Sequence, residues 1–266
     1  MRLLTPILPD RASPLGRANP LAKLVAAFVL LLALFVSLDG VTAGLILVAL
    51  LALLPVSGVG VAALLGRSRL LLLAALAVAV VNTLLAPEQA GPTLLEIGPM
   101  RIGADTALSG LWLGLRLLAI AFAGLLATVT SEPVDVADAL IQQWRVSPRF
   151  ALGALAAVRL LPSFAREWET IGLARRARGL EAGSPTAALR LLGGRLLALL
   201  VGGVRRATRM AAAMESRGLG SRDCRTVARP QRMRSADWGW IAGALALAAG
   251  AVACSLWLGT WRFLLG

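Results

Sequence analysis

Residues 107–129 read ALSGLWLGLRLLAIAFAGLLATV, and this stretch decides the fold class. Its 23 residues include one charged side chain, Arg116. A helix needs roughly 20 apolar residues to cross the hydrocarbon core of a bilayer, so the stretch is long enough to be a transmembrane helix. The composition of the whole chain also indicates a membrane protein, with 58% hydrophobic and 15% charged residues and a mean hydropathy of +0.78. Such a composition excludes an ordinary soluble domain.

Four more apolar runs have a similar character: Leu21–Leu38, Val41–Leu65, Leu70–Ala86 and Trp238–Leu258. The first resembles a signal-peptide core, but the apolar sequence resumes directly after Ala43, which favours a retained anchor. Pro55 lies inside the second run and is a candidate interruption. The sequence therefore predicts an all-α, multi-pass membrane protein with about five transmembrane helices.

The positions of the basic residues predict the orientation, because loops rich in Arg and Lys remain cytoplasmic. The N-terminal tail and the turn predicted after the second span are basic, whereas the segment from Pro87 to Thr106 is mostly acidic. We predict a bacterial inner-membrane protein with a cytoplasmic N-terminus. Its expected regions are a tail (1–20), a membrane region of four spans (21–129), a cytoplasmic helical region (130–235) and a final span (236–266).

The cytoplasmic region carries most of the net charge of +13, since residues 130–235 hold 18 arginines against 8 acidic residues. From Leu189 to Met214 the apolar residues recur every three or four positions, which predicts an amphipathic helix lying along the membrane surface with its arginines at the lipid headgroups. Aromatic residues are few, so a nucleic-acid surface is not expected. Ser131-Glu132-Pro133 predicts a helix start, Pro162 a kink and residues 183–185 a break.

Two helices of this region are expected to end in the same triplet, Arg-Gly-Leu, at residues 178–180 and 217–219. Gly179 and Gly218 stand where a helix C-terminus favours a residue of positive φ. Each arginine also lies seven residues after an apolar position of its helix, Ile171 or Met210, and so continues the apolar stripe. The triplets are either ordinary helix ends with a last-turn cation, or docking points for a partner.

Catalysis by this chain has little support in the sequence. Histidine and tyrosine are absent, and the two cysteines, Cys224 and Cys254, lie far apart, which argues against a zinc site or a disulfide framework. Lys23 is the single lysine, so a phosphate-binding loop of the GxxxxGK[ST] type is excluded, and any ATP must be hydrolysed by another chain. Asp135 and Asp138 match the D-x-x-D pattern of metal-dependent membrane transferases, but without a second acidic cluster they are better explained as helix-start acids.

The motifs, taken together in their order, resemble the T component, or transmembrane coupling subunit, of energy-coupling factor (ECF) transporters, the CbiQ-like family. The resemblance is carried by Ala177-Arg178-Gly179 and Ser216-Arg217-Gly218, with support from the following segments: Asn19–Leu24, Val81–Leu85, Leu115–Leu118, Thr128–Pro133, Asp138–Leu140 and Val158–Pro162.

The resemblance implies a function in transport. In that family, two coupling helices contact a pair of cytoplasmic ABC-type ATPase subunits, or one double ATPase, which bind the ATP. The membrane part holds a substrate-binding S component that captures a vitamin, a vitamin precursor or a metal ion. Arg178 is expected to dock on one ATPase and Arg217 on the other. This chain itself is expected to need no cofactor and to catalyse no reaction.

Two polar residues inside predicted spans have more than one explanation. Arg116 and Asn82 could bond the backbone of a neighbouring helix, or could contact the S component. Two other functions also remain open: a permease subunit of a conventional ABC importer, which would carry one coupling helix per subunit, and a membrane-embedded transferase.

Overall fold

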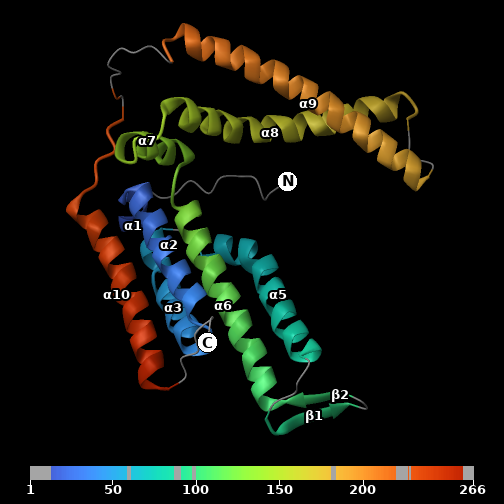
Figure 1. Cartoon of the computed structure of the whole chain (residues 1–266). Coiled ribbons are helices and arrows are strands. Elements are labelled where there is room, and N and C mark those ends of the chain that lie inside the picture. The colour runs from blue at the N-terminus through green and yellow to red at the C-terminus, as the bar shows by residue number, and fades with distance from the viewer. Residues whose placement is uncertain are drawn as a thin grey trace. The chain divides into compact units, whose positions relative to one another are not determined.

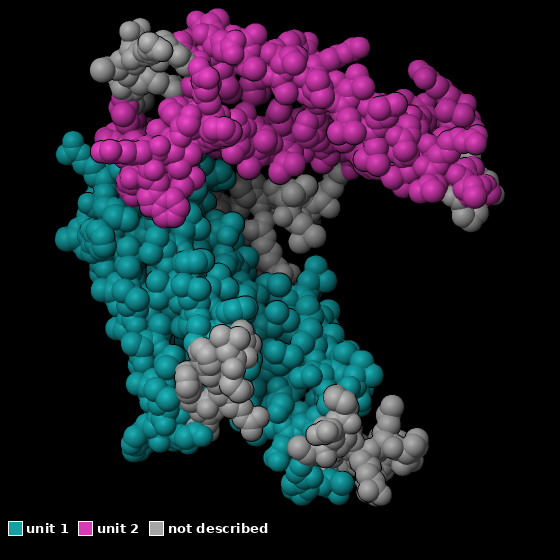
Figure 2. Space-filling view, in the orientation of Figure 1, with its two compact units in different colours: residues 1–139, 231–266 teal, residues 140–230 magenta. Residues whose placement is uncertain are grey.

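A computed structural model of the chain describes residues 13–58, 61–86, 91–97, 100–180, 184–219, 227 and 229–259. The chain forms two compact units, shown in different colours in Figure 2. Unit 1 comprises Met1–Ala139 and Gln231–Gly266, and unit 2 comprises Leu140–Pro230. The described chain is helical apart from one two-stranded hairpin, which confirms the predicted all-α multi-pass class. The predicted tail up to residue 12 and Cys224 lie outside the described residues.

Unit 1 contains a bundle of apolar helices, the last of which returns to the bundle after the chain has formed unit 2 (Figure 1). Its elements are α1 (Pro14–Arg17), α2 (Pro20–Val36), α3 (Gly40–Ala52), α4 (Leu54–Ser57), α5 (Val61–Leu85), β1 (Thr93–Ile97), β2 (Met100–Gly103), α6 (Ala104–Val129) and α10 (Ser235–Trp257). A further helix, α7 (Pro133–Gln143), includes the division between the units and begins where Ser131-Glu132-Pro133 predicts a helix start.

The core of unit 1 lies where α2, α3, α6 and α10 meet. Leu34 of α2 and Ile46 of α3 are fully buried, and small residues such as Ala119 and Ala248 let the other two helices approach closely. Many large apolar side chains point outward instead, among them Phe28, Phe35, Leu70, Leu73 and Leu76. An apolar outer surface of this extent fits a lipid environment.

The predicted second span, Val41–Leu65, is not one continuous helix, and the interruption indicated by Pro55 is present. Helix α3 ends at Ala52, the short α4 follows from Leu54, and Gly58 adopts a positive φ of 68°. Pro55 lacks a backbone N–H and the left-handed glycine ends the turn, so the apolar run is divided in two. A further correction concerns Arg67 and Arg69, which lie within α5 and not in a turn.

The segment between α5 and α6 contains structure that the sequence did not predict. For Pro87–Thr106 the charge pattern predicts only the external side of the membrane, and the segment contains β1 and β2, which pair antiparallel with Glu96 opposite Arg101. Gly103 directly precedes α6, so the hairpin leads straight into that helix (Figure 1). The charge pattern, which predicts the side of the membrane, carries no information about strand pairing.

Four helices of the described chain are long and apolar enough to cross a membrane: Ser68–Leu85, Ala104–Val129, Thr186–Ser216 and Ser235–Trp257. Helices α2 and α3 are apolar but shorter. The third of the four belongs to unit 2 and carries five arginines, at positions 190, 195, 205, 206 and 209. A charged residue at the bilayer centre costs about 2.5 to 3.5 kcal/mol on insertion scales, which disfavours a membrane-spanning role for this helix.

Buried polar groups tie together three helix ends of unit 1. Asp237, near the start of α10, is 3% exposed, and its two carboxylate oxygens accept the backbone N–H groups of Asn19 and Arg234, each at 2.7 Å. The ammonium group of Lys23, in the first turn of α2, donates to the carbonyl oxygen of Thr130 at 2.7 Å, at the C-terminus of α6. A cation at that position also interacts favourably with the helix dipole.

Replacing Asp237 with alanine is expected to destabilise unit 1 by about 2 to 4 kcal/mol, because two backbone donors then lose their acceptor. Thermal unfolding of the detergent-purified chain measures the effect. Asp237→Asn keeps one acceptor oxygen, so its stability should lie between that of the wild type and that of Asp237→Ala. Asp105→Ala, which removes an exposed first-turn acid of α6, is the matched control and should change stability by less than about 1 kcal/mol. Equal stability of Asp237→Ala and the control would contradict the structural role of this carboxylate.

Candidate functional site in the helix pair of unit 2

The candidate site is built on the two long helices of unit 2. Helix α8 (Pro148–Ala177) has 30 residues and α9 (Pro185–Ser216) has 32, so each is roughly 45 to 50 Å long. They run antiparallel and cross each other (Figure 1). Helix α8 continues through Pro162, and α9 starts after the N-cap Ser184, where a break was predicted.

Three arginines hold the crossing together. The Arg195 guanidinium lies over the Trp168 ring, 4.1 Å from its centroid, and its Nε donates to the Trp168 carbonyl oxygen at 2.9 Å. Arg206 forms an ion pair with Glu167, while Arg175 of α8 donates to the Leu191 carbonyl oxygen at 2.7 Å. Charge-assisted bonds of this kind are stronger and more directional than apolar contact alone, so they fix the position at which the helices cross.

The crossing corrects one expectation about α9. Arg195 and Arg206 were predicted to lie at lipid headgroups, but they bind α8 instead. The apolar stripe predicted from Leu189 onward is exposed, with Leu189 at 74% and Leu200 and Val204 at 63%. The periodicity identified the two faces of α9 correctly, but it could not reveal that α8 supplies the carboxylate and the carbonyl that bind the arginines.

Both helices end in the same hydrogen-bonded motif. At the end of α8, Leu180 N–H donates to Arg175 O at 3.1 Å and Gly179 N–H donates to Arg176 O at 2.9 Å. At the end of α9, Leu219 N–H donates to Met214 O at 3.0 Å and Gly218 N–H donates to Glu215 O at 2.9 Å. These are Schellman motifs, and they require a left-handed residue at the glycine position. Gly179 and Gly218 have φ values of 71° and 80°, which confirms the predicted helix ends.

The Schellman geometry explains the glycine and the leucine of each Arg-Gly-Leu triplet but not the arginine. The glycine supplies the positive φ, and the leucine occupies the position that often makes an apolar contact with the last turn. Arg178 and Arg217 are the C-cap residues, where no arginine is needed. Both side chains are exposed, and neither forms a hydrogen bond or an ion pair with another described residue. Within the described part of the chain, both guanidinium groups are exposed without a bonded neighbour.

The two arginines lie at opposite ends of the pair, because the helices are antiparallel and each arginine follows a C-terminus. Ala177 and Ser216, the residues before them, are the last of α8 and α9. With helices roughly 45 to 50 Å long, one small partner surface would not readily reach both guanidinium groups. The geometry thus places the two guanidinium groups at separate ends of the helix pair.

Arg217 borders a groove between the first half of α8 and the last half of α9. This groove has a volume of about 430 Å³ and is lined by apolar side chains, including Leu152, Met210 and Met214, together with a second arginine, Arg159. Met210 and Arg217 thus lie along the same groove, as their seven-residue spacing predicts. The sequence alone does not place Arg159 at this end, because its contact with the groove depends on the pairing of the two helices.

Arg116 and Asn82 belong to unit 1 and form no part of this helix pair. The Arg116 Nη2 donates to the Phe35 carbonyl oxygen at 2.9 Å, near the C-terminus of α2, and Asp39 adds a favourable electrostatic interaction. Asn82 is exposed on α5. Among the described residues, no group of three or more His, Cys, Asp or Glu side chains is placed to hold a metal ion.

Comparison with known proteins assigns the chain to a family. The family model CbiQ, described as "Cobalt transport protein", matches residues 11–226. Among curated proteins, the energy-coupling factor transporter transmembrane protein EcfT of Heliobacterium modesticaldum is 30% identical over 242 residues, covering 85% of this chain and 87% of the relative. EcfT of Lacticaseibacillus paracasei is 28% identical over 240 residues, which cover 87% of this chain and 90% of the relative.

A third relative, EcfT of Exiguobacterium sibiricum, is 31% identical over 160 residues, which are 57% of this chain and 61% of the relative. The match to such relatives thus spans about three fifths of their length. The family match includes α8, α9 and both Arg-Gly-Leu triplets, so it extends over the candidate site as well as the four helices α2, α3, α5 and α6. The chain therefore belongs to the CbiQ family, the transmembrane components of energy-coupling factor transporters.

Proposed function

We propose that this chain couples ATP hydrolysis by two partner subunits to substrate uptake, with α8 and α9 as its coupling helices. The observation that carries the proposal is the pair of exposed C-cap arginines, Arg178 and Arg217, at opposite ends of an antiparallel helix pair. Each would insert into a pocket of one ABC-type ATPase subunit, or of one half of a double ATPase, that offers a carboxylate or backbone carbonyls.

The crossing of the helices gives this arrangement a mechanical role. When the two ATPases approach or separate, their docking points move relative to each other, and helices tied at the crossing by Arg195 and Arg206 would turn as levers. The exposed apolar stripe of α9 would transmit that motion to the membrane and to a substrate-binding S component. ATP would be bound by the ATPases, and no catalytic step is assigned to this chain.

The proposed orientation places α8, α9 and the N-terminus in the cytoplasm of a bacterial cell, where the ATPases are. The excess of arginine in residues 130–235 supports it, because basic segments remain on the cytoplasmic side. The proposed cargo is a vitamin, a vitamin precursor or a metal ion, taken up through the S component. Asn82, exposed on α5, is a proposed contact for that subunit.

Co-purification of the ATPases with the tagged chain tests the docking. Arg178→Ala and Arg217→Ala should each weaken retention while leaving some ATPase bound, since a guanidinium buried at an interface is worth about 2 to 5 kcal/mol and the other end still binds. Arg176→Ala and Arg209→Ala are matched controls, because they remove exposed arginines of the same two helices. Loss of ATPase from the controls to the same extent would show that general charge binds it, and would contradict specific docking by the C-cap arginines.

A further inference from the structure

The groove beside Arg217 contains a second exposed cation, Arg159, which belongs to the other helix of the pair. Arg217 follows the last residue of α9, whereas Arg159 lies in the first half of α8, and both line the same groove of about 430 Å³. Both side chains are exposed, and neither forms a hydrogen bond or an ion pair with another described residue. The antiparallel pairing of α8 and α9 therefore brings two guanidinium groups to one surface.

The positive charge of this groove is not balanced within its walls. Among the described residues that line it there are two arginines and no Asp or Glu, and the rest of the lining is leucine, methionine and alanine. An adjoining groove of about 330 Å³ between the same helices offers a contrast, because its lining includes one arginine, Arg149, and one acid, Glu215. The two grooves share Met210 and Met214. The unbalanced charge is therefore on the Arg217 side of the pair.

The apolar side chains of the groove suit it to a protein surface better than to a free anion. Leu152, Leu155, Met210 and Met214 are each only partly buried, so they leave apolar area that another chain can cover. Methionine is flexible and polarisable and adapts to the shape of a bound partner, and two of the five methionines of the chain lie here. An apolar surface with two cations complements an acidic segment that also carries apolar side chains.

We propose that Arg159 is a second docking residue for the ATPase at the Arg217 end, and that the partner segment bound there offers a carboxylate to each guanidinium beside apolar side chains. This inference rests on the proposed coupling function, and it adds a residue outside the Arg-Gly-Leu triplets and the chemistry of the partner surface. Each guanidinium can bind one carboxylate through two parallel hydrogen bonds. Two carboxylates would also offset the repulsion between guanidinium groups that share one groove.

The first test places Arg159 at one end of the helix pair by comparing two backgrounds. The affinity of the purified ABC-type ATPase pair of the same transporter for the detergent-purified full chain is measured with Arg159→Ala added to Arg178→Ala or to Arg217→Ala. In the Arg178→Ala background the Arg217 end carries the binding, so Arg159→Ala should weaken it about tenfold further. In the Arg217→Ala background that end is already impaired, and the further loss should be less than about threefold. Such non-additivity identifies residues that act on one contact.

The matched control is Arg149→Ala, which removes another exposed arginine from the first half of α8, on the adjoining groove. In the Arg178→Ala background it should change the ATPase affinity by less than about threefold. Arg159→Ala should leave the thermal unfolding of the chain unchanged, because the side chain is exposed and alanine favours a helix. Equal losses of affinity from Arg159→Ala and Arg149→Ala would overturn the proposal, since general charge would then explain both.

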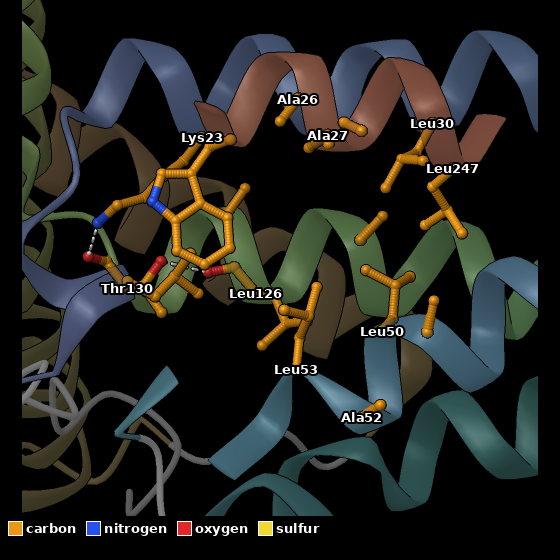
Figure 3. Close-up of a pocket in the computed structure, with 17 residues that line it drawn as sticks. Lys23, Ala26, Ala27, Leu30, Leu50, Ala52, Leu53, Leu126, Thr130 and Leu247 are labelled. Carbon is orange, nitrogen blue, oxygen red and sulfur yellow. Dashed lines mark hydrogen bonds between the residues drawn. The ribbon is translucent and has the colours of Figure 1, made fainter. Parts of the chain in front are cut away.

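The second test identifies the chemistry of the partner surface. Lys23 is the single lysine of the chain, and it is buried with its ammonium group bonded to the Thr130 carbonyl oxygen (Figure 3), so Arg159→Lys would add the only exposed lysine. A water-soluble carbodiimide joins a lysine amine to a nearby carboxylate through an amide bond. In the assembled complex, Arg159→Lys and Arg217→Lys, tested separately, should each become cross-linked to the same acidic segment of one ATPase subunit, and Arg149→Lys should not.

The outcomes separate this inference from the proposed function. If Arg159→Lys forms no cross-link to an ATPase, or if Arg159→Ala has equal effects in both backgrounds, the role of Arg159 is overturned. The coupling function still stands in that case, provided that Arg178→Ala/Arg217→Ala loses the ATPases. An Arg159 side chain that binds lipid phosphate instead would give both of these results. If the ATPases stay bound to the chain that lacks both C-cap arginines, the proposed function fails and this inference fails with it.

Discussion

Replacing both Arg178 and Arg217 with alanine is expected to abolish ATP-driven uptake and to remove the ATPase subunits from the purified complex. Each guanidinium is worth about 2 to 5 kcal/mol at a buried interface, so losing one leaves the other as a tether. A tether keeps the second contact at a high effective concentration, which is why single variants retain part of their function. Once both are lost, that advantage disappears, and the combined effect should exceed the product of the single effects.

Uptake should be measured in cells for a labelled cargo that the wild type accumulates, chosen from vitamins and divalent metal ions. The double variant Arg176→Ala/Arg209→Ala removes the same charge from the same helices and should keep its uptake. The pair Arg178→Lys/Arg217→Lys keeps the charge but loses the planar, bidentate fork, so it should resemble the alanine pair more than the wild type. Wild-type uptake by the alanine pair would exclude the coupling role of these residues.

The sequence was sufficient to predict where the two helices end, but not how their ends are arranged. Gly179 and Gly218 are positions where local chemistry decides the backbone, and the observed φ values agree. The separation of Arg178 and Arg217 depends on the antiparallel crossing, which Arg195 and Arg206 stabilise through groups on α8. Those contacts join residues 27 and 39 positions apart, beyond the reach of a periodicity argument.

The apolar runs also show which features the sequence can and cannot predict. Hydropathy located α2, α6 and α10 to within a few residues, because length and composition decide whether a helix can cross a bilayer. Hydropathy alone did not locate the end of α3 at Ala52, because Pro55 and Gly58 change the backbone while the sequence stays apolar; it was the proline that indicated the interruption. Hydropathy also missed the β1–β2 hairpin, whose strands are too short to produce a clear alternating pattern.

Arg116 illustrates why an isolated charge in a span is hard to interpret from sequence. Its acceptor is the backbone carbonyl of Phe35, and every residue type has such a carbonyl, so no motif could identify the partner. The carbonyl lies near the end of α2, where helix carbonyls have no intrahelical donor. This bond therefore satisfies two groups at once, the guanidinium and a carbonyl at the end of α2.

The second large effect is expected at Gly110, where α5 and α6 are in close contact. A Cβ at Gly110 would overlap the Thr83 hydroxyl and lie 2.6 Å from the Ala79 carbonyl oxygen, which is backbone and cannot move without shifting α5. Gly114, one turn further along α6, approaches Ala75 and Ala79 in the same way. Small residues four apart allow close packing of membrane helices, in which dispersion forces and not the hydrophobic effect hold the pair together.

Gly110→Leu is therefore expected to separate α5 from α6 and to lower the free energy of unfolding by about 3 kcal/mol or more, at the upper end of overpacking effects. Gly124→Leu is the control on the same helix, because a Cβ there meets nothing within 4 Å, and it should be neutral or slightly stabilising. Thermal unfolding in detergent measures the difference. If Gly110→Leu were as stable as Gly124→Leu, α5 would not depend on this contact, and the exposed apolar face of α5 would have to be held by the lipid or by a partner subunit instead.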